Sequence, residues 1–287
     1  MKIKVVTDSS ANLLELKNVE LVSVPLRITI GGREFLDTPE QPVEEMMRAM
    51  DECTGPTSTA CPSVGDWLEA FGDGEKIFAP VLTGSLSGCY NSAAIAAKEY
   101  MRAHPRRKVY LIDTLSTGPE MELLLERFDA LIGAGADFDA ACRETHAYLA
   151  STGLVFMLGS LENLARNGRV SPALAKLVGL LNIRIVGRAS EKGELEPINR
   201  CRGERRALDQ LWKSMCQAGY SGGRVRIRHT EGASVSARLR QLILDNCPGA
   251  DVRIQANRVL CSYYAEHGGI LVGFETIPQK RSGRGRS

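Results

Sequence analysis

The chain has 287 residues, 44% of them hydrophobic and 24% charged, which is enough material for one large or two ordinary globular domains. Its 36 basic and 34 acidic side chains give a net charge of +2, so no nucleic-acid partner is expected. The opening MKIKVVTDSS lacks the apolar core of a signal peptide, and no apolar run reaches membrane-spanning length. We therefore expect a cytoplasmic protein without an integral membrane segment.

The first half of the chain alternates strand and helix patterns. Buried strands are predicted at 2–8, 19–30, 76–82 and 107–113. Helices are predicted after Asp8 and at 42–50, 63–71, 91–102 and 121–133, with residues 53–63 as a loop. This order predicts a parallel sheet covered by helices on both faces, a three-layer α/β/α domain over residues 1–153.

Residues 154–278 have a different pattern. Strand-like runs occur at 154–158, 183–190, 193–198, 224–230, 251–256 and 270–276. Helical patterns cover 160–168, 171–181, 204–218 and 234–246. We expect a second, two-layer α/β domain with a mixed sheet, and a disordered basic tail at 279–287.

The eight cysteines form no CxxC pair and no cluster with histidine. Structural zinc sites and redox motifs normally need such spacing. We therefore expect reduced thiols, no metal site and no cofactor.

Polar segments follow three of the predicted parallel strands: Asp8, residues 83–87 and residues 113–118. Ligands in such sheets lie beyond the carboxyl ends of the strands, so these segments are expected to converge. The second segment carries the hydroxyls of Thr83, Ser85 and Ser87 next to a helix start, which favours an anion. It could hold a phosphate, hold a carboxylate, or supply a serine nucleophile.

Two of these three readings are weak. The sequence G-S-L-S-G places Leu86 where a hydrolase elbow needs serine, and neither His104 nor His146 is a convincing partner base. No Walker motif and no G-x-G-x-x-G after a strand is present to bind a nucleotide. A carboxylate ligand is favoured, with a stand-alone phosphotransferase or hydrolase using residues 83–87 as the alternative.

Six segments together resemble the DegV family: TDSSANL, TSTACPS, LTGSLSGCYNSA, LIDTLSTG, ENLARNGRVS and EPINRCRGERRALDQL. They occur in the family's order and span 7–274. The resemblance implies a two-domain fold like that of the dihydroxyacetone-kinase substrate domain. It also implies a long-chain fatty acid, such as palmitate, stearate or oleate, bound between the domains. The resemblance further implies that the protein is not an enzyme itself and presents the carboxylate to a separate fatty acid kinase.

The resemblance also assigns residues. Thr59 and Ser87 match the positions that hydrogen-bond the carboxylate. Arg169 matches the arginine of a Gly-Gly-Arg segment near the ligand head, and Arg202 matches a basic position that faces the kinase.

The chain departs from the family near its C-terminus, where AEHGGILVGF replaces His-x-Gly-Pro-Gly. Aligning on Gly268 and Gly273 puts Glu266 in the column of the family's histidine and His267 one place later. A glutamate there would repel the ligand carboxylate unless one of the two is protonated. His267 is the candidate ligand-facing residue, and the alternative is that Glu266 occupies the position of the family's histidine.

Overall fold

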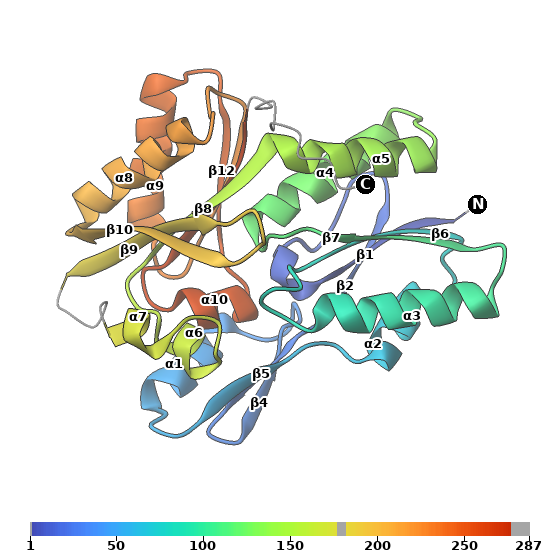
Figure 1. The fold of residues 1–287 in the computed structure, drawn as a ribbon, viewed down its shortest axis with the longest axis horizontal. Coiled ribbons are helices and arrows are strands. Elements are labelled where there is room, and N and C mark those ends of the chain that lie inside the picture. The colour runs from blue at the N-terminus through green and yellow to red at the C-terminus, as the bar shows by residue number, and fades with distance from the viewer. Residues whose placement is uncertain (1, 177–181, 277–287) are drawn as a thin grey trace.

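The computed structural model describes residues 2–176 and 182–276. Within them, the N-terminal domain has a parallel sheet in the order β2-β1-β6-β7. Its strands are β1 (Ile3–Asp8), β2 (Glu20–Val24), β6 (Lys76–Val81) and β7 (Lys108–Asp113). Helices cover both faces (Figure 1): α2 (Val64–Phe71) and α3 (Cys89–Ala103) on one, α4 (Pro119–Gly133) and α5 (Phe138–Tyr148) on the other. The predicted three-layer α/β/α arrangement is confirmed.

Aromatic side chains fill both helix–sheet interfaces. Trp67 and Phe71 of α2 pack with Tyr100 of α3 against one face of the sheet. On the other face, the rings of Phe78 and Phe128 stack with centroids 4.3 Å apart. Burial on both faces explains the nearly continuous apolar runs of these strands.

A small antiparallel sheet, in the order β4-β3-β5, was not expected from the sequence. Its strands are β3 (Arg27–Ile30), β4 (Arg33–Leu36) and β5 (Thr57–Ala60), and α1 (Val43–Glu52) lies between the last two in the chain. The run 19–30, predicted as one strand, is divided at Pro25 between two sheets, because proline cannot donate a ladder hydrogen bond. The segment 53–63, predicted as a loop, contains β5. The helix predicted after Asp8 is a single 3₁₀ turn, Ser9–Ala11.

The second domain has a six-stranded sheet in the order β10-β9-β8-β13-β11-β12. Its strands are β8 (Thr152–Leu158), β9 (Ile183–Ala189), β10 (Leu195–Arg202), β11 (Arg224–His229), β12 (Asp251–Ala256) and β13 (Ile270–Glu275). β11 and β12 pair in parallel and the other neighbours are antiparallel, which confirms the predicted mixed sheet. Helices α8 (Glu204–Gln217) and α9 (Ala233–Asn246) cover one face.

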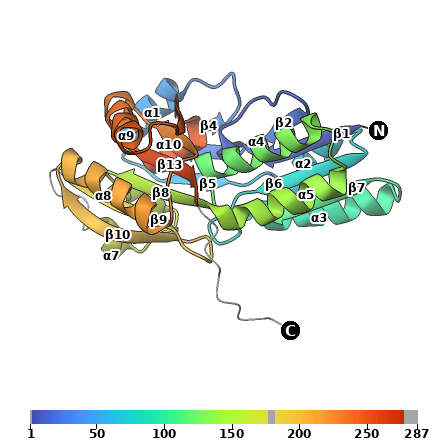
Figure 2. The ribbon, with the colours of Figure 1, turned by 90° about the horizontal axis from the view of Figure 1, so that it is seen from above.

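The other face of this sheet packs against α4 of the first domain and against three short helices, so the two domains lie side by side (Figure 2). These helices are α6 (Glu162–Arg166), α7 (Pro172–Lys176) and α10 (Val259–Ala265). Part of the predicted helix 171–181 and the whole predicted tail 279–287 lie outside the described residues. None of the helices in the described part of the chain is long and apolar enough to cross a membrane.

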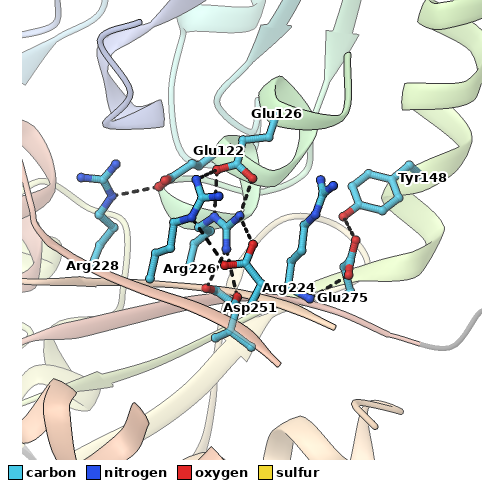
Figure 3. A network of polar contacts seen from close by, with 10 residues as sticks. Glu122, Glu126, Tyr148, Arg224, Arg226, Arg228, Asp251 and Glu275 are labelled. Atoms are coloured by element: carbon cyan, nitrogen blue, oxygen red, sulfur yellow. Dashed lines mark hydrogen bonds and ion pairs between the residues drawn. The ribbon is translucent and has the colours of Figure 1, made fainter. Parts of the chain in front are cut away.

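Buried ion pairs connect the domains at α4 and β11 (Figure 3). Arg226 is only 1% exposed and donates to Glu126 at 2.6 Å and to Asp251 at 2.9 Å. Two residues along the strand, Arg228 donates to Glu122 at 2.9 Å. Because side chains two residues apart share a face of a strand, β11 presents a row of arginines to the acidic face of α4.

Candidate functional site

A cavity of about 80 Å³ lies between the two domains. Leu26, Leu82 and Leu86 line it from the first domain. The second domain contributes Phe156, Leu158, Leu164, Leu195, Leu260, Cys261, Ala265 and Leu271. Most of the wall is therefore aliphatic, so the cavity suits the apolar part of a ligand.

Hydroxyl groups and one guanidinium interrupt this apolar wall. The hydroxyls of Thr59 on β5 and Tyr264 on α10 lie 2.6 Å apart, and both residues line the cavity with Ser87 and Arg169. Burial raises the pKa of Tyr264, with the hydrogen bond to Thr59 and the charge of Arg169 acting in the opposite sense. The phenol is therefore protonated at neutral pH. Since one proton suffices to link the two hydroxyls, the other can be donated to a ligand.

The loop that carries Ser87 is held by the neighbouring strand ends. Asp8 accepts a hydrogen bond from the backbone N–H of Leu82 at 2.7 Å, and the N–H of Gly84 donates to Asp113 at 3.2 Å. Burial raises the pKa of Asp8, although the hydrogen bonds from Ser10 and Leu82 oppose the shift. The predicted convergence of the three polar segments is confirmed, and Ser87 is the hydroxyl-bearing residue of its loop that lines the cavity.

Arg169 follows α6 and crosses from the second domain to that same loop. Its Nε donates to the carbonyl of Leu86 at 3.0 Å, and its Nη1 donates to the carbonyl of Asn167. The residue lines both the cavity and an adjoining polar surface hollow that includes Ser85 and Glu194. Arg169 therefore lies where the cavity opens towards the surface.

The described surroundings of Ser87 do not activate it as a nucleophile. Its hydroxyl donates to the sulfur of Cys89 at 3.2 Å, and no histidine lines the described wall of the cavity. Burial raises the pKa of Cys89, so its thiol is no general base at neutral pH. This geometry suits an anion-binding hydroxyl better than a catalytic serine.

His267 and Glu266 do not join Thr59 and Ser87 at the cavity. The imidazole of His267 lies between Asp51 and Glu231, with both contacts at 2.6 Å. Glu266 is buried and accepts a hydrogen bond from the backbone N–H of Asn163 at the start of α6. Burial raises the pKa of Glu266, with the Asn163 donor opposing the shift. Neither residue belongs to the described lining of the cavity, and a ligand-facing role for His267 stays a prediction.

Arg202 is exposed at the end of β10, whose first residue, Leu195, lines the cavity. Arg202 is seven positions further along this extended strand than Leu195, or roughly 23 Å. A partner that reaches both the cavity opening and Arg202 would have to cover the length of this strand.

Tyr264 is the site residue that sequence reasoning missed. The local sequence SYYAEHGG gives no sign of it, because its partner Thr59 is 205 residues away in the chain. The alignment on two glycines favoured Glu266 and His267 instead.

Comparison with known proteins agrees with this fold. Residues 2–275 match the DegV family of uncharacterised proteins. A DegV domain-containing protein of Streptococcus pneumoniae strain R6 is 38% identical over 276 residues, which span 95% of this chain and 98% of that protein.

Two solved structures are similar over nearly their whole length. A DegV family protein from Eubacterium eligens, loaded with heptadecanoic acid, is 38% identical with a TM-score of 0.93, over 96% of this chain and 100% of that chain. The Streptococcus pneumoniae Fatty Acid Kinase B3 protein, loaded with linoleic acid, is 37% identical with a TM-score of 0.94 over the same shares. The chain therefore belongs to the DegV family.

Proposed function

We propose that this protein binds a long-chain fatty acid in the cavity between its domains. The alkyl chain contacts the leucine-rich wall. The carboxylate lies near Arg169 and accepts one hydrogen bond from the Thr59–Tyr264 pair and one from Ser87, whose hydroxyl turns from Cys89 to donate it. The observation that carries this proposal is the combination, in one cavity, of an aliphatic wall with hydroxyls and a guanidinium. The fatty acids held by the two similar structures support it.

Burial of the alkyl chain is expected to supply most of the binding free energy. About 15 methylenes contribute roughly 0.8 kcal/mol each on burial, or about 12 kcal/mol before the costs of binding. Each hydroxyl hydrogen bond contributes only about 1 kcal/mol. The hydroxyls therefore set where the carboxylate lies more than how tightly the ligand binds. At about 80 Å³ the cavity is small for a ligand pocket, so the lining side chains must move apart on binding.

The second part of the proposal is that the protein presents the carboxylate to a separate kinase, which transfers the phosphoryl group. The opening beside Arg169 gives a partner access to the carboxylate end, and Arg202 supplies a positive charge for docking. The name of the pneumococcal Fatty Acid Kinase B3 protein supports a kinase partner for this fold.

Reconstitution tests this division of labour. The purified protein loaded with oleate is incubated with ATP, with and without a bacterial fatty acid kinase, and acyl phosphate is trapped with hydroxylamine. We expect product only when both proteins are present. Acyl phosphate or ATP hydrolysis with this protein alone would instead support the stand-alone enzyme.

A further inference from the structure

The ring of Phe156 forms part of the cavity wall. The residue lies on β8, is 1% exposed and is larger than every other purely apolar side chain lining the cavity. Resting on the proposed function, we infer that Phe156 sets the length of alkyl chain that the cavity accepts.

The position of the ring follows from its neighbours in the sheet. Phe156 pairs with Gly187 on β9 and with Leu271 on β13, and Leu271 also lines the cavity. A Cβ atom placed on Gly187 would lie 2.6 Å from Cε2 of the ring. The ring therefore occupies the space that a side chain of β9 would otherwise fill.

The ring of Phe156 has no group that could hydrogen-bond a carboxylate. Its cluster consists mainly of aliphatic and sulfur-containing side chains, including Leu154 and Ile185, and the ring of Tyr264 packs against this cluster while its hydroxyl bonds Thr59. Phe156 thus acts on the alkyl chain and not on the carboxylate.

Truncating Phe156 should lengthen the space available to the ligand. The vacated volume cannot be filled from β9, because residue 187 is glycine, so a cavity remains and joins the existing one. Each additional buried methylene should then raise affinity by about fourfold.

Phe274 provides a matched control on the same sheet. It is also 1% exposed, and its ring lies against a glycine, with Cζ 3.0 Å from the Cβ position of Gly153. Phe274 belongs to the cluster under α8 and α9 and does not line the cavity. Phe274→Leu therefore costs packing without changing the ligand space.

The experiment measures competition by saturated fatty acids of 14 to 20 carbons against a fluorescent fatty acid. It compares the wild type with Phe156→Leu, Phe156→Ala and Phe274→Leu, after thermal melting confirms that each variant is folded. We expect both Phe156 variants to shift the preferred length upwards, with at least fourfold higher affinity for the longer chains relative to the shorter ones. Phe274→Leu should bind the fatty acids of 14 to 20 carbons in the same order of affinity as the wild type.

Two outcomes overturn the inference. The role of Phe156 is contradicted if its variants keep the wild-type order of affinities across chain lengths, or if Phe274→Leu shifts the preferred chain length equally. Either result leaves fatty-acid binding itself intact. If the wild type binds none of the fatty acids, the proposed function fails and the inference fails with it.

Discussion

Two hydroxyls from distant parts of the chain form the polar centre of the cavity. Thr59 lies on a short strand of the first domain, and Tyr264 lies on a short helix beyond the arginine row of β11. Their 2.6 Å contact fixes both side chains, so a ligand carboxylate meets one preoriented hydroxyl donor from this pair. This pair accounts for carboxylate binding without a histidine.

Tyr264→Phe tests that role. Removing the hydroxyl should weaken fatty-acid binding by about 1 kcal/mol, or roughly fivefold, because one hydrogen bond to the carboxylate is lost while the ring still lines the cavity. Tyr263→Phe is the control, since that hydroxyl bonds Thr57 at 2.6 Å and lies outside the cavity lining. Equal affinities in both variants, measured by fluorescence titration, would exclude Tyr264 from the carboxylate site.

His267 should act on stability in a pH-dependent way. Although partial burial disfavours the charged imidazole, its hydrogen bonds to Asp51 and Glu231 raise the pKa of His267. The stabilisation is then fully present below about pH 6.5 and is lost as the pH rises through the higher folded-state pKa. Urea unfolding of the wild type and His267→Gln should give a free-energy difference that shrinks from pH 6 to pH 9.

Fatty-acid titration of these proteins and of Glu266→Gln tests the competing role at the ligand. If His267 faced the carboxylate, wild-type affinity would fall between pH 6 and 8 and His267→Gln would flatten that profile. If Glu266 did, Glu266→Gln would tighten binding. With both side chains outside the cavity lining, we expect unchanged affinities.

Substitution of Arg202 tests whether this residue contacts the kinase. Arg202→Ala should leave fatty-acid affinity unchanged and slow acyl-phosphate formation by the kinase, because the charge is exposed and distant from the cavity. Arg240→Ala, an exposed arginine on α9, is the control. Wild-type turnover by Arg202→Ala would remove the residue from the interface.

Residues with local motifs could be predicted from the sequence, and residues defined by distant contacts could not. Thr59, Ser87 and Arg169 lie in short motifs, and all three line the cavity. The positions of Tyr264 and His267 depend on which strand and helix each turn packs against, which no local pattern reports.

At the scale of elements, the β9–β10 hairpin covers the loop that carries Ser87 (Figure 1). Ser85 donates to the carbonyl of Lys192 in the hairpin turn at 2.5 Å. A Cβ atom on Gly193 would lie 2.9 Å from the Cα of Leu115 and 3.0 Å from the Cβ of Thr83. The turn therefore sits against the first domain beside the cavity opening.

Gly193→Ala should lift this turn from the loop and speed fatty-acid release. The added methyl clashes with backbone at residue 115, and the φ of +75° disfavours a side chain. Gly135→Ala is the matched control, because its φ is +84° with nothing within 4 Å, so it carries strain without a clash. Stopped-flow dissociation should be faster only for Gly193→Ala; equal rates would show that the turn does not restrict release.

The elements that sequence reasoning missed are short and depend on tertiary contacts. β5 spans only Thr57–Ala60. It forms a strand because it pairs with β3, and its own composition does not indicate one. α10 has seven residues, too few for helical periodicity to show, and is held by packing against α1 and α6. The long apolar strands and the helices α3, α4, α8 and α9 could be predicted because the spacing of apolar residues within each segment indicates its structure.

For the whole molecule, the ion pairs between α4 and β11 join the domains that form the cavity. Arg226→Met should destabilise the protein by about 1–3 kcal/mol, since the largely buried Glu126 loses both hydrogen bonds from Arg226 and keeps only its pair with the exposed Arg253. Arg188→Met breaks the exposed pair with Glu196 and should cost less than about 1 kcal/mol. Similar losses in urea unfolding would show that the buried network contributes no more than a surface pair.

Fatty-acid binding between the two domains is the central claim, and mass spectrometry of ligand released from the denatured, purified protein tests it most directly. The protein is isolated from bacteria, and a second sample is incubated with oleate and passed through a desalting column. We predict a long-chain fatty acid in the first sample, and oleate in the second in an amount comparable to the protein. A nucleotide in place of a lipid, or no fatty acid in either sample, would contradict the account.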